Sequence, residues 1–205
     1  MRSRKPIRAV LFDMDGTVVD VPYNWPEIKE KLETRGVPIL THLTALEEPE
    51  RSLKWEILTG YEDEATSRAK LKKGIVELLD LLARRGVRTA LVTNNSGKNL
   101  RVILERFRLH FDLVLSRESG FWKPSAAPFR AVLERFGLEA DECCVAGDST
   151  IDIKAAEEAG IRSIFILSGE PERFSGLNVE ILADAVALTK RLRRILRGQP
   201  KITRP

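Results

Sequence analysis

Four short motifs in the sequence contain the residue types that phosphoryl chemistry requires. They are Asp13-Met14-Asp15-Gly16-Thr17, Thr93-Asn94-Asn95-Ser96-Gly97, Lys123-Pro124 and Gly147-Asp148-Ser149-Thr150-Ile151-Asp152. Four aspartates brought close together repel one another and cannot all stay ionised without cations. The motifs contain no His or Cys, and ligands that are all oxygen atoms suit a hard metal ion. We expect Mg²⁺ because it needs few carboxylates and keeps water and phosphate oxygens as ligands.

The other groups in these motifs suit a tetrahedral anion. Lys123 would add a positive charge, while Thr93, the amides that follow it and Gly16 would donate hydrogen bonds to anion oxygens. A metal ion, a lysine and backbone amides around one anion describe a phosphoryl-transfer site.

Each motif taken alone has a simpler interpretation. The first could be a plain turn, the second a helix N-cap loop, Lys123 a solvated charge, and the fourth a helix cap with a surface acid. If all four simple interpretations were correct, four unrelated features would have to occur by chance in this order. Each would also have to fall directly after a predicted strand. We therefore favour one shared site.

Short apolar runs alternate with helical patterns along the chain, which predicts a doubly wound parallel α/β sheet. The expected strands, apolar enough to be buried on both faces, are 8–12, 88–92, 112–115, 143–146 and 163–167. The expected helices are 75–84, 100–106, 127–136 and 151–159. Ligands of such sheets bind at the carboxyl ends of the strands, so the four motifs should converge on one edge.

The interval 21–73 shows no strand pattern but has apolar positions of its own. Leu53, Ile57 and Tyr61 recur at helical spacing, and Trp25-Pro26-Glu27 is typical of a helix start with proline in its first turn. We predict a small helical insert at 21–73 within a core made of 1–20 and 74–205.

The end of the chain is amphipathic and basic. Residues 179–196 predict a closing helix with Ile181 and Leu182 in its apolar stripe. From Lys190 onward there are seven basic residues and no acidic one, which leaves 27 basic against 30 acidic residues elsewhere. The pI of 9.2 therefore says little about the whole surface. We interpret the tail as a solvated helix end; nucleic-acid binding would have to rest on it alone.

The sequence favours a cytoplasmic protein. No apolar run approaches the ~18 residues of a spanning helix, and the basic start is followed by too few apolar residues for a signal peptide. Cys143 and Cys144 are adjacent, so they predict no disulfide framework and a reducing compartment.

The four motifs, in their order from residue 8 to residue 167, resemble those of the haloacid dehalogenase (HAD) superfamily. The insert after the first motif resembles the cap of the phosphoglycolate phosphatase and phosphoglucomutase branch. The resemblance implies a Rossmann-like three-layer core whose parallel strands, numbered along the chain, lie in the order 5-4-1-2-3. It also implies a small all-helical cap inserted after the first strand.

The resemblance implies catalytic roles as well. Asp13 would attack phosphorus to give an aspartyl phosphate, while Asp15 would protonate the leaving alcohol and then activate water. The implied Mg²⁺ ligands are Asp13, the backbone carbonyl of Asp15, Asp148 and, through water or by orienting its neighbours, Asp152. The implied phosphate ligands are Gly16, Thr93, the Asn94 amide and Lys123, with Thr93 and Lys123 also acting in catalysis.

These roles predict a Mg²⁺-dependent phosphatase of small phosphorylated metabolites, with phosphoglycolate the first candidate. The partner is a small phosphate ester; we expect no membrane or nucleic-acid partner, and a monomer or homodimer. Related mutases carry a cap histidine twelve residues after the nucleophile, where this chain has Trp25. A phosphotransferase or phosphomutase, or a non-catalytic protein that binds nucleic acid or a partner through its tail, remains an alternative. Possible substrate contacts are Trp25, Arg51, Lys54 and Trp122.

Overall fold

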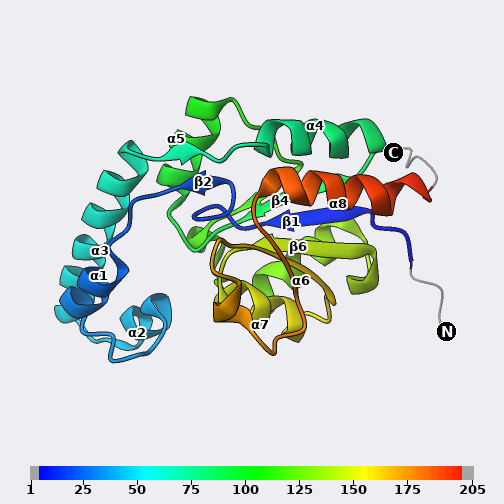
Figure 1. The fold of residues 1–205 in the computed structure, drawn as a ribbon. Helices are drawn as coiled ribbons and strands as arrows, with labels where there is room; N and C mark the ends of the chain where they lie inside the picture. Colours follow the sequence, from blue (N-terminus) through cyan, green and yellow to red (C-terminus); the bar gives the residue numbers. More distant parts are fainter. Residues whose placement is uncertain (1–4, 200–205) are drawn as a thin grey trace.

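A six-stranded parallel sheet forms the centre of the structure, a computed structural model that describes residues 5–199 (Figure 1). Its strands are β1 (Ala9–Phe12), β4 (Arg88–Val92), β5 (Leu113–Leu115), β6 (Cys143–Gly147), β7 (Ser163–Leu167) and β8 (Glu180–Leu182). They lie in the order β5-β4-β1-β6-β7-β8. The α/β class and the order of the five predicted strands are confirmed, and the one difference is β8, which adds a sixth strand beside β7.

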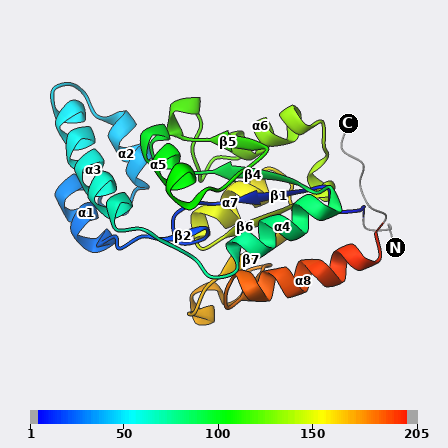
Figure 2. The ribbon, with the colours of Figure 1, turned by 90° about the horizontal axis from the view of Figure 1, so that it is seen from above.

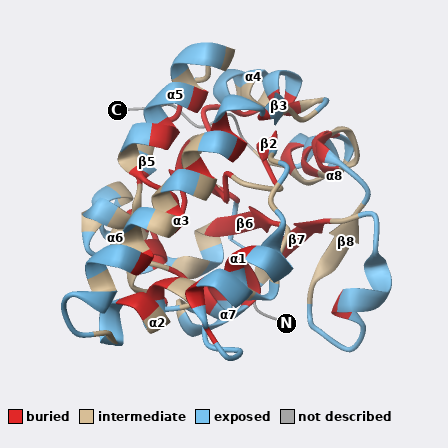
Figure 3. Cartoon of the chain, turned by 90° about the vertical axis from the view of Figure 1, so that its left-hand side faces the viewer, coloured by how far each residue is buried: buried red, intermediate tan, exposed pale blue. Residues whose placement is uncertain are grey.

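Helices cover both faces of this sheet, as Figures 1 and 2 show. One face packs against α4 (Ile75–Arg85), α5 (Gly97–Phe107) and α8 (Ala185–Arg197), and the other against α6 (Ala127–Phe136) and α7 (Thr150–Glu158). Successive strand residues point to opposite faces. Val10 and Phe12 accordingly join the first hydrophobic layer, and Ala9 and Leu11 join the second. Figure 3 shows buried residues on the strands and exposed ones on the outer helix faces.

The segment between β1 and α4 lies beyond the carboxyl ends of the strands (Figure 1). It contains α1 (Trp25–Leu32), α2 (Ile39–Ala45) and α3 (Glu50–Ser67), and α1 begins at Trp25 as predicted. The three helices share a hydrophobic cluster formed by Ile28, Leu32, Leu40, Leu43 and Leu58. Two short antiparallel strands, β2 (Val19–Asp20) and β3 (Lys70–Leu71), carry the chain into and out of this segment. Within residues 21–73 the helices are joined by one strand, β3, which is too short to produce a strand pattern.

Helix α3 buries a different face from the one that its apolar spacing suggests. Leu53 is 57% exposed, and Ile57 and Tyr61 are half-buried. The buried positions include Lys54 and Glu62, because each of these charged side chains has an ion-pair partner outside the helix. The helix was predicted correctly, but its apolar spacing gave no sign of these pairs.

The prediction of one helix over 179–196 is wrong in its first part. Ile181 and Leu182 belong to β8, where they pair with Ile166 and Leu167 of β7. Helix α8 begins only at Ala185, because the side chain of Asp184 accepts a hydrogen bond from the amide of Ala187 at 2.8 Å and so caps the helix.

The basic tail is only partly described. Lys201 and Arg204 lie outside the described residues, while Arg191 pairs with Glu180 at 2.7 Å. Among residues 5–199, no helix is both long and apolar enough to span a membrane. Cys143 and Cys144 are both buried and free, as their adjacency predicts.

A buried ion pair joins α3 to the core. Arg117, in the short helix η1 (Arg117–Ser119) after β5, donates to Glu62 Oε1 at 2.8 Å, and the two side chains are only 10% and 7% exposed. The guanidinium carbon also lies 5.0 Å from the centre of the Trp55 ring. Burial raises the pKa of Glu62 to about 7, although the charge of Arg117 acts to lower it.

We expect Arg117→Met to lower the free energy of unfolding by about 3 kcal/mol at about pH 8, because it leaves the Glu62 carboxylate buried and unpaired. Arg68→Met, which breaks the exposed Arg68–Glu64 pair, is the matched control and should cost less than about 1 kcal/mol. Urea unfolding of both variants measures the difference. Equal losses would show that the buried pair contributes no more than a surface pair.

Candidate active site

The carboxyl ends of β1 and β6 bring three aspartates together. Asp13 directly follows β1, Asp148 follows β6, and Asp152 lies in the first turn of α7. Each offers a carboxylate oxygen, and these oxygens all lie within 4.8 Å of one another. Asp15 is outside this group of three.

Lys123 supplies the positive charge in this cluster. Its ammonium group donates to Asp13 Oδ1 at 2.5 Å and to Asp152 Oδ1 at 2.7 Å, and the residue is 3% exposed. Burial lowers the pKa of Lys123, but the charges of Asp13 and Asp152 outweigh burial and raise it overall. The ammonium group therefore stays charged.

The side chain of Asn94 holds Lys123 in place. Its Nδ2 donates to the carbonyl oxygen of Lys123 at 2.8 Å, and its Oδ1 accepts from the amide of Lys123 at 2.9 Å. This reciprocal pair ties the loop after β4 to the loop that carries the lysine. The Asn94 side chain is thus engaged with Lys123, and the phosphate contact of the Asn94 backbone amide stays a prediction.

Asp152 orients its neighbours. Its Oδ2 accepts from the amide of Ser149 at 3.2 Å and from the Ser149 hydroxyl at 2.6 Å, while its Oδ1 accepts from Lys123. Because Ser149 is the N-cap of α7, these contacts fix the start of the helix together with the lysine.

Gly16 allows Asp148 to approach the first motif. Its φ of +86° is in the left-handed region, and a Cβ there would lie 1.9 Å from Asp148 Oδ2. Any other residue would displace that carboxylate. Thr93 is 3% exposed, and its Oγ1 accepts from the amide of Asn95 at 3.0 Å, which leaves its hydroxyl proton free for another acceptor.

Asp15 contacts a residue to which the sequence analysis gave no role. Its Oδ2 accepts from Asn95 Nδ2 at 3.0 Å, and its Oδ1 is buried with no hydrogen-bond partner among the described residues. Burial raises the pKa of Asp15 to about 6, although the Asn95 hydrogen bond and the charge of Lys123 both act to lower it. Asn95 lies within the second motif, but its spacing gave no sign of this contact.

The aspartates near Lys123 are also perturbed. Burial raises the pKa of Asp13 well above its usual range, opposed by Lys123 and reinforced by the charges of Asp152, Asp148 and Asp15. Burial, with the charge of Asp152, raises the pKa of Asp148 to about 6. The cluster therefore holds more negative charge than Lys123 alone neutralises.

Without a divalent cation, we expect the free energy of unfolding to fall as pH rises from about 4 past 6, because burial raises the folded-state pKa of Asp15 and Asp148 from 3.8 to about 6. A group whose pKa is higher in the folded state stabilises the protein at pH values below its unfolded-state pKa. This stabilisation is lost as the pH rises through its folded-state pKa. Each shift corresponds to roughly 3 kcal/mol.

Urea unfolding over this pH range, in EDTA and in Mg²⁺, measures the effect. Mg²⁺ should restore stability above about pH 6, and Asp148→Asn should flatten the EDTA profile because it removes one titrating group. A wild-type profile that is already flat in EDTA would contradict the expectation.

A polar cavity of about 620 Å³ lies beside the cluster of Asp13, Asp148 and Asp152, of which Asp148 is among the described lining residues. Asp15, Gly16 and Asp148 line it, and Tyr23 and Trp25 reach it from the chain that enters α1. Its remaining lining residues are Asp20, Val21, Lys72, Leu167, Ser168, Gly169, Glu170 and Arg173. Two of these, Lys72 and Arg173, are cations that the sequence analysis did not single out.

The other proposed substrate contacts lie elsewhere. Arg51 pairs with Glu48 at 2.8 Å, and Lys54 pairs with Glu33 at 2.7 Å. Trp122 packs against the hydrophobic cluster of α1–α3. Of the four candidates, Trp25 alone is among the described residues that line the cavity.

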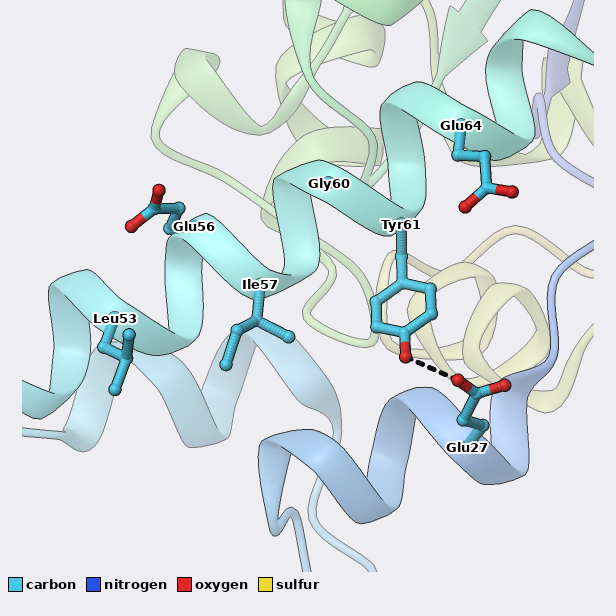
Figure 4. Close-up of a pocket in the computed structure, with 7 residues that line it drawn as sticks. All are labelled: Glu27, Leu53, Glu56, Ile57, Gly60, Tyr61 and Glu64. Atoms are coloured by element: carbon cyan, nitrogen blue, oxygen red, sulfur yellow. Dashed lines mark hydrogen bonds between the residues drawn. The ribbon is translucent and has the colours of Figure 1, made fainter.

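A second hollow, of about 650 Å³, lies between α1 and α3 (Figure 4). Leu53, Ile57 and Gly60 line it together with acidic side chains, and the Tyr61 hydroxyl donates to Glu27 Oε1 at 2.6 Å. It contains no residue of the four motifs.

The acidic cluster fits a hard divalent cation. Its donors are all carboxylate oxygens, which Mg²⁺ prefers. Among the described residues, the Asp148 carboxylate has no hydrogen bond or ion pair, and the absence of a side chain at Gly16 lets it lie against the first motif. Asp13 and Asp148 would hold the ion, with Asp152 close by.

Comparison with known proteins agrees with this geometry. A family model described as haloacid dehalogenase-like hydrolase matches residues 7–160. An uncharacterized hydrolase of Saccharomyces cerevisiae is 24% identical, covering 95% of this chain and 96% of its own. A phosphoglycolate phosphatase of Xanthomonas campestris is 29% identical over 79% of this chain and 84% of its own. The structure of a predicted phosphoglycolate phosphatase from Haemophilus somnus matches with a TM-score of 0.71 at 24% identity, covering 93% of this chain and all of that one.

The chain belongs to the haloacid dehalogenase-like hydrolases. This membership confirms the family predicted from the motifs, and the similarity to phosphoglycolate phosphatases agrees with the predicted branch.

Proposed function

We propose that this protein is a Mg²⁺-dependent phosphatase that hydrolyses a small phosphate monoester through an aspartyl phosphate on Asp13. The observation that carries the proposal is the buried contact between Lys123 and Asp13 within a cluster of further aspartates. A lysine that contacts the nucleophile can also face the phosphoryl group and stabilise the charge that develops there. The family membership and the names of the relatives support this assignment.

The reaction begins at Asp13. One carboxylate oxygen attacks phosphorus, the bond from phosphorus to the ester oxygen breaks, and Asp15 gives its proton to the departing alcohol. In the second step water attacks phosphorus while the Asp15 carboxylate takes its proton, and the bond from phosphorus to the Asp13 oxygen breaks, which releases phosphate and restores the Asp13 carboxylate. Asp15 must therefore hold a proton in the first step and lack one in the second, which a pKa of about 6 permits.

In this proposal three groups bind the phosphoryl oxygens. The Thr93 hydroxyl has its proton available, the Asn94 amide lies in the loop whose side chain anchors Lys123, and Lys123 is charged. Mg²⁺ held by Asp13, Asp148 and the backbone carbonyl of Asp15 would offset the negative charge shared by the phosphate and the aspartates. Asp152 keeps Lys123 oriented while this happens.

The helical segment at 21–73 acts in this proposal as a cap over the site. Tyr23 and Trp25, which lie where the chain enters this segment, line the cavity. Closure of the segment would therefore exclude water from the reaction. Phosphoglycolate is the first substrate to test, since relatives are named for it. A cytoplasmic location remains a prediction.

Phosphate release from a panel of phosphorylated metabolites, with Mg²⁺ and with EDTA, tests the proposal. We expect release by the wild type in Mg²⁺ and loss of release in EDTA. Isomerised sugar phosphate without free phosphate would instead identify a mutase. The structure offers no histidine for that reaction at the cavity, since His42 contacts the carbonyl of Leu32 at 3.0 Å and neither His42 nor His110 is among the described lining residues.

A further inference from the structure

We propose that Asn95, supported by Tyr23, is a positioning residue that holds the Asp15 carboxyl for proton transfer to the leaving group. The inference rests on the proposed phosphatase function and adds to it a residue that acts through Asp15. Asn95 is 3% exposed, so it reaches the reaction only through its neighbours.

The side-chain amide of Asn95 has a fixed orientation. Its Oδ1 accepts from the backbone amide of Ser96 at 2.7 Å and from Asn99 Nδ2 at 3.2 Å. Because a backbone N–H can only donate, the oxygen of the Asn95 amide must face Ser96. Nδ2 then points the other way, toward Asp15 and Tyr23, where it donates at 3.0 Å to each.

The backbone of Asn95 is held as firmly as its side chain. Its amide donates to Thr93 Oγ1 at 3.0 Å, and its carbonyl accepts from the amide of Arg117 at 3.2 Å. All the hydrogen-bonding capacity of the side chain is in use, two donors and two acceptors. A residue so fully bonded cannot turn away from Asp15 without breaking several contacts.

This arrangement makes the two oxygens of Asp15 different. Oδ2 receives the Asn95 hydrogen bond, whereas Oδ1 has no partner among the described residues, and Asp15 lines the cavity that also exposes Asp148. Oδ1 is therefore the oxygen left to hold a proton. In the first step that proton moves to the ester oxygen as the bond from phosphorus breaks, and Asp15 is left as a carboxylate.

Tyr23 completes the arrangement from the chain that enters the helical segment. Its hydroxyl accepts the second hydrogen of Asn95 Nδ2, and its ring lies 4.4 Å from that of Trp25, measured between centroids. Both aromatic residues line the cavity. The position of the Asp15 carboxyl is thus tied to the entrance of the cap segment.

The test compares leaving groups. Asn95→Asp keeps the shape of the side chain but cannot donate to Asp15, and Asn95→Ala removes the donor without adding a charge. For each variant, kcat/KM is measured on two alkyl esters, phosphoglycolate and β-glycerophosphate, and on p-nitrophenyl phosphate. The nitrophenolate leaves without being protonated, and kcat/KM reports only the steps up to departure of the leaving group.

We expect both variants to lose about 10²-fold or more in kcat/KM on the alkyl esters, the lower end of what general acid catalysis contributes, and only a few-fold on the aryl ester. Asn99→Ala is the matched control, because Asn99 contacts the other side of the Asn95 amide and does not touch Asp15. It should affect both classes of ester equally.

Equal losses on the alkyl and aryl esters in both Asn95 variants would overturn the proposal, because they would mean that Asn95 only supports the local structure. The wild type separates this outcome from failure of the proposed function. A wild type that hydrolyses none of the three esters contradicts the phosphatase assignment itself, whereas an active wild type with equal losses in the variants contradicts only the role of Asn95.

Discussion

Asp13→Asn should abolish phosphate release while leaving the protein folded. We expect kcat/KM to fall by about 10⁶-fold, the order of magnitude observed when a covalent nucleophile is removed. An amide oxygen is too weak a nucleophile to form the phosphoenzyme, and no other step replaces that bond. Phosphate release under saturating Mg²⁺, beside the wild type, measures the loss.

The fold should tolerate this change because Asn keeps an acceptor for Lys123. Asp13 is buried, and burial and three neighbouring aspartates raise its pKa, so removal of its charge relieves repulsion. We therefore expect a melting temperature at or above that of the wild type in EDTA.

One outcome would contradict the nucleophile assignment, and a second would contradict only the expected stability of the variant. A variant purified free of host phosphatase that kept a tenth of the wild-type activity would show that Asp13 is not the nucleophile. A variant that was inactive because it unfolded would show a lower melting temperature and would leave activity loss without a chemical meaning, so both measurements are made on the same preparation.

Lys123→Met should lose both activity and stability. Removal of one partner from a buried ion pair costs about 3–5 kcal/mol, because the remaining charges stay buried without compensation. Lys123 is 3% exposed and contacts Asp13 and Asp152. On kcat/KM we expect about a 10³-fold loss, since in the proposed mechanism the lysine also stabilises the charge on the phosphoryl group.

The stability loss should depend on pH. Lys123 lowers the pKa of Asp13, so its removal raises that pKa further. A raised folded-state pKa stabilises the protein only at low pH and loses its effect as pH rises. The deficit of Lys123→Met relative to the wild type should therefore be larger at about pH 8 than at about pH 5.

Urea unfolding at both pH values gives this comparison. Lys98→Met is the control, because Lys98 and Asp63 form an exposed pair at 2.5 Å and its loss should cost less than about 1 kcal/mol at either pH. If Lys123→Met lost no more stability than Lys98→Met, the lysine would not be the counter-charge of the cluster.

Much of the fold followed from local patterns. The apolar runs of β1, β4 and β6 are buried on nearly every residue, so they could be recognised as central strands without knowledge of their partners. Polar motifs directly after these runs implied a shared edge. The start of α1 was equally local, because proline in the first turn depends only on adjacent residues.

The errors arose where distant contacts decide the outcome. The apolar spacing of Leu53 and Ile57 predicted a helix correctly, but that helix also buries Glu62, whose partner Arg117 lies 55 residues away. The stretch 179–196 looked like one helix because Ile181 and Leu182 fit its period. Pairing with β7 made them a strand instead.

By itself, the sequence determined which strands are buried and which chemical groups lie at their carboxyl ends, because burial and chain direction depend on local composition and spacing. The tertiary structure alone decided how those groups contact one another. Asn95 meets Asp15 across 80 residues and Tyr23 across 72, and Asn94 meets the backbone of Lys123 across 29. Such hydrogen bonds depend on how the loops that follow different strands pack together. That packing cannot be predicted from the periodicity or spacing of residues along the chain.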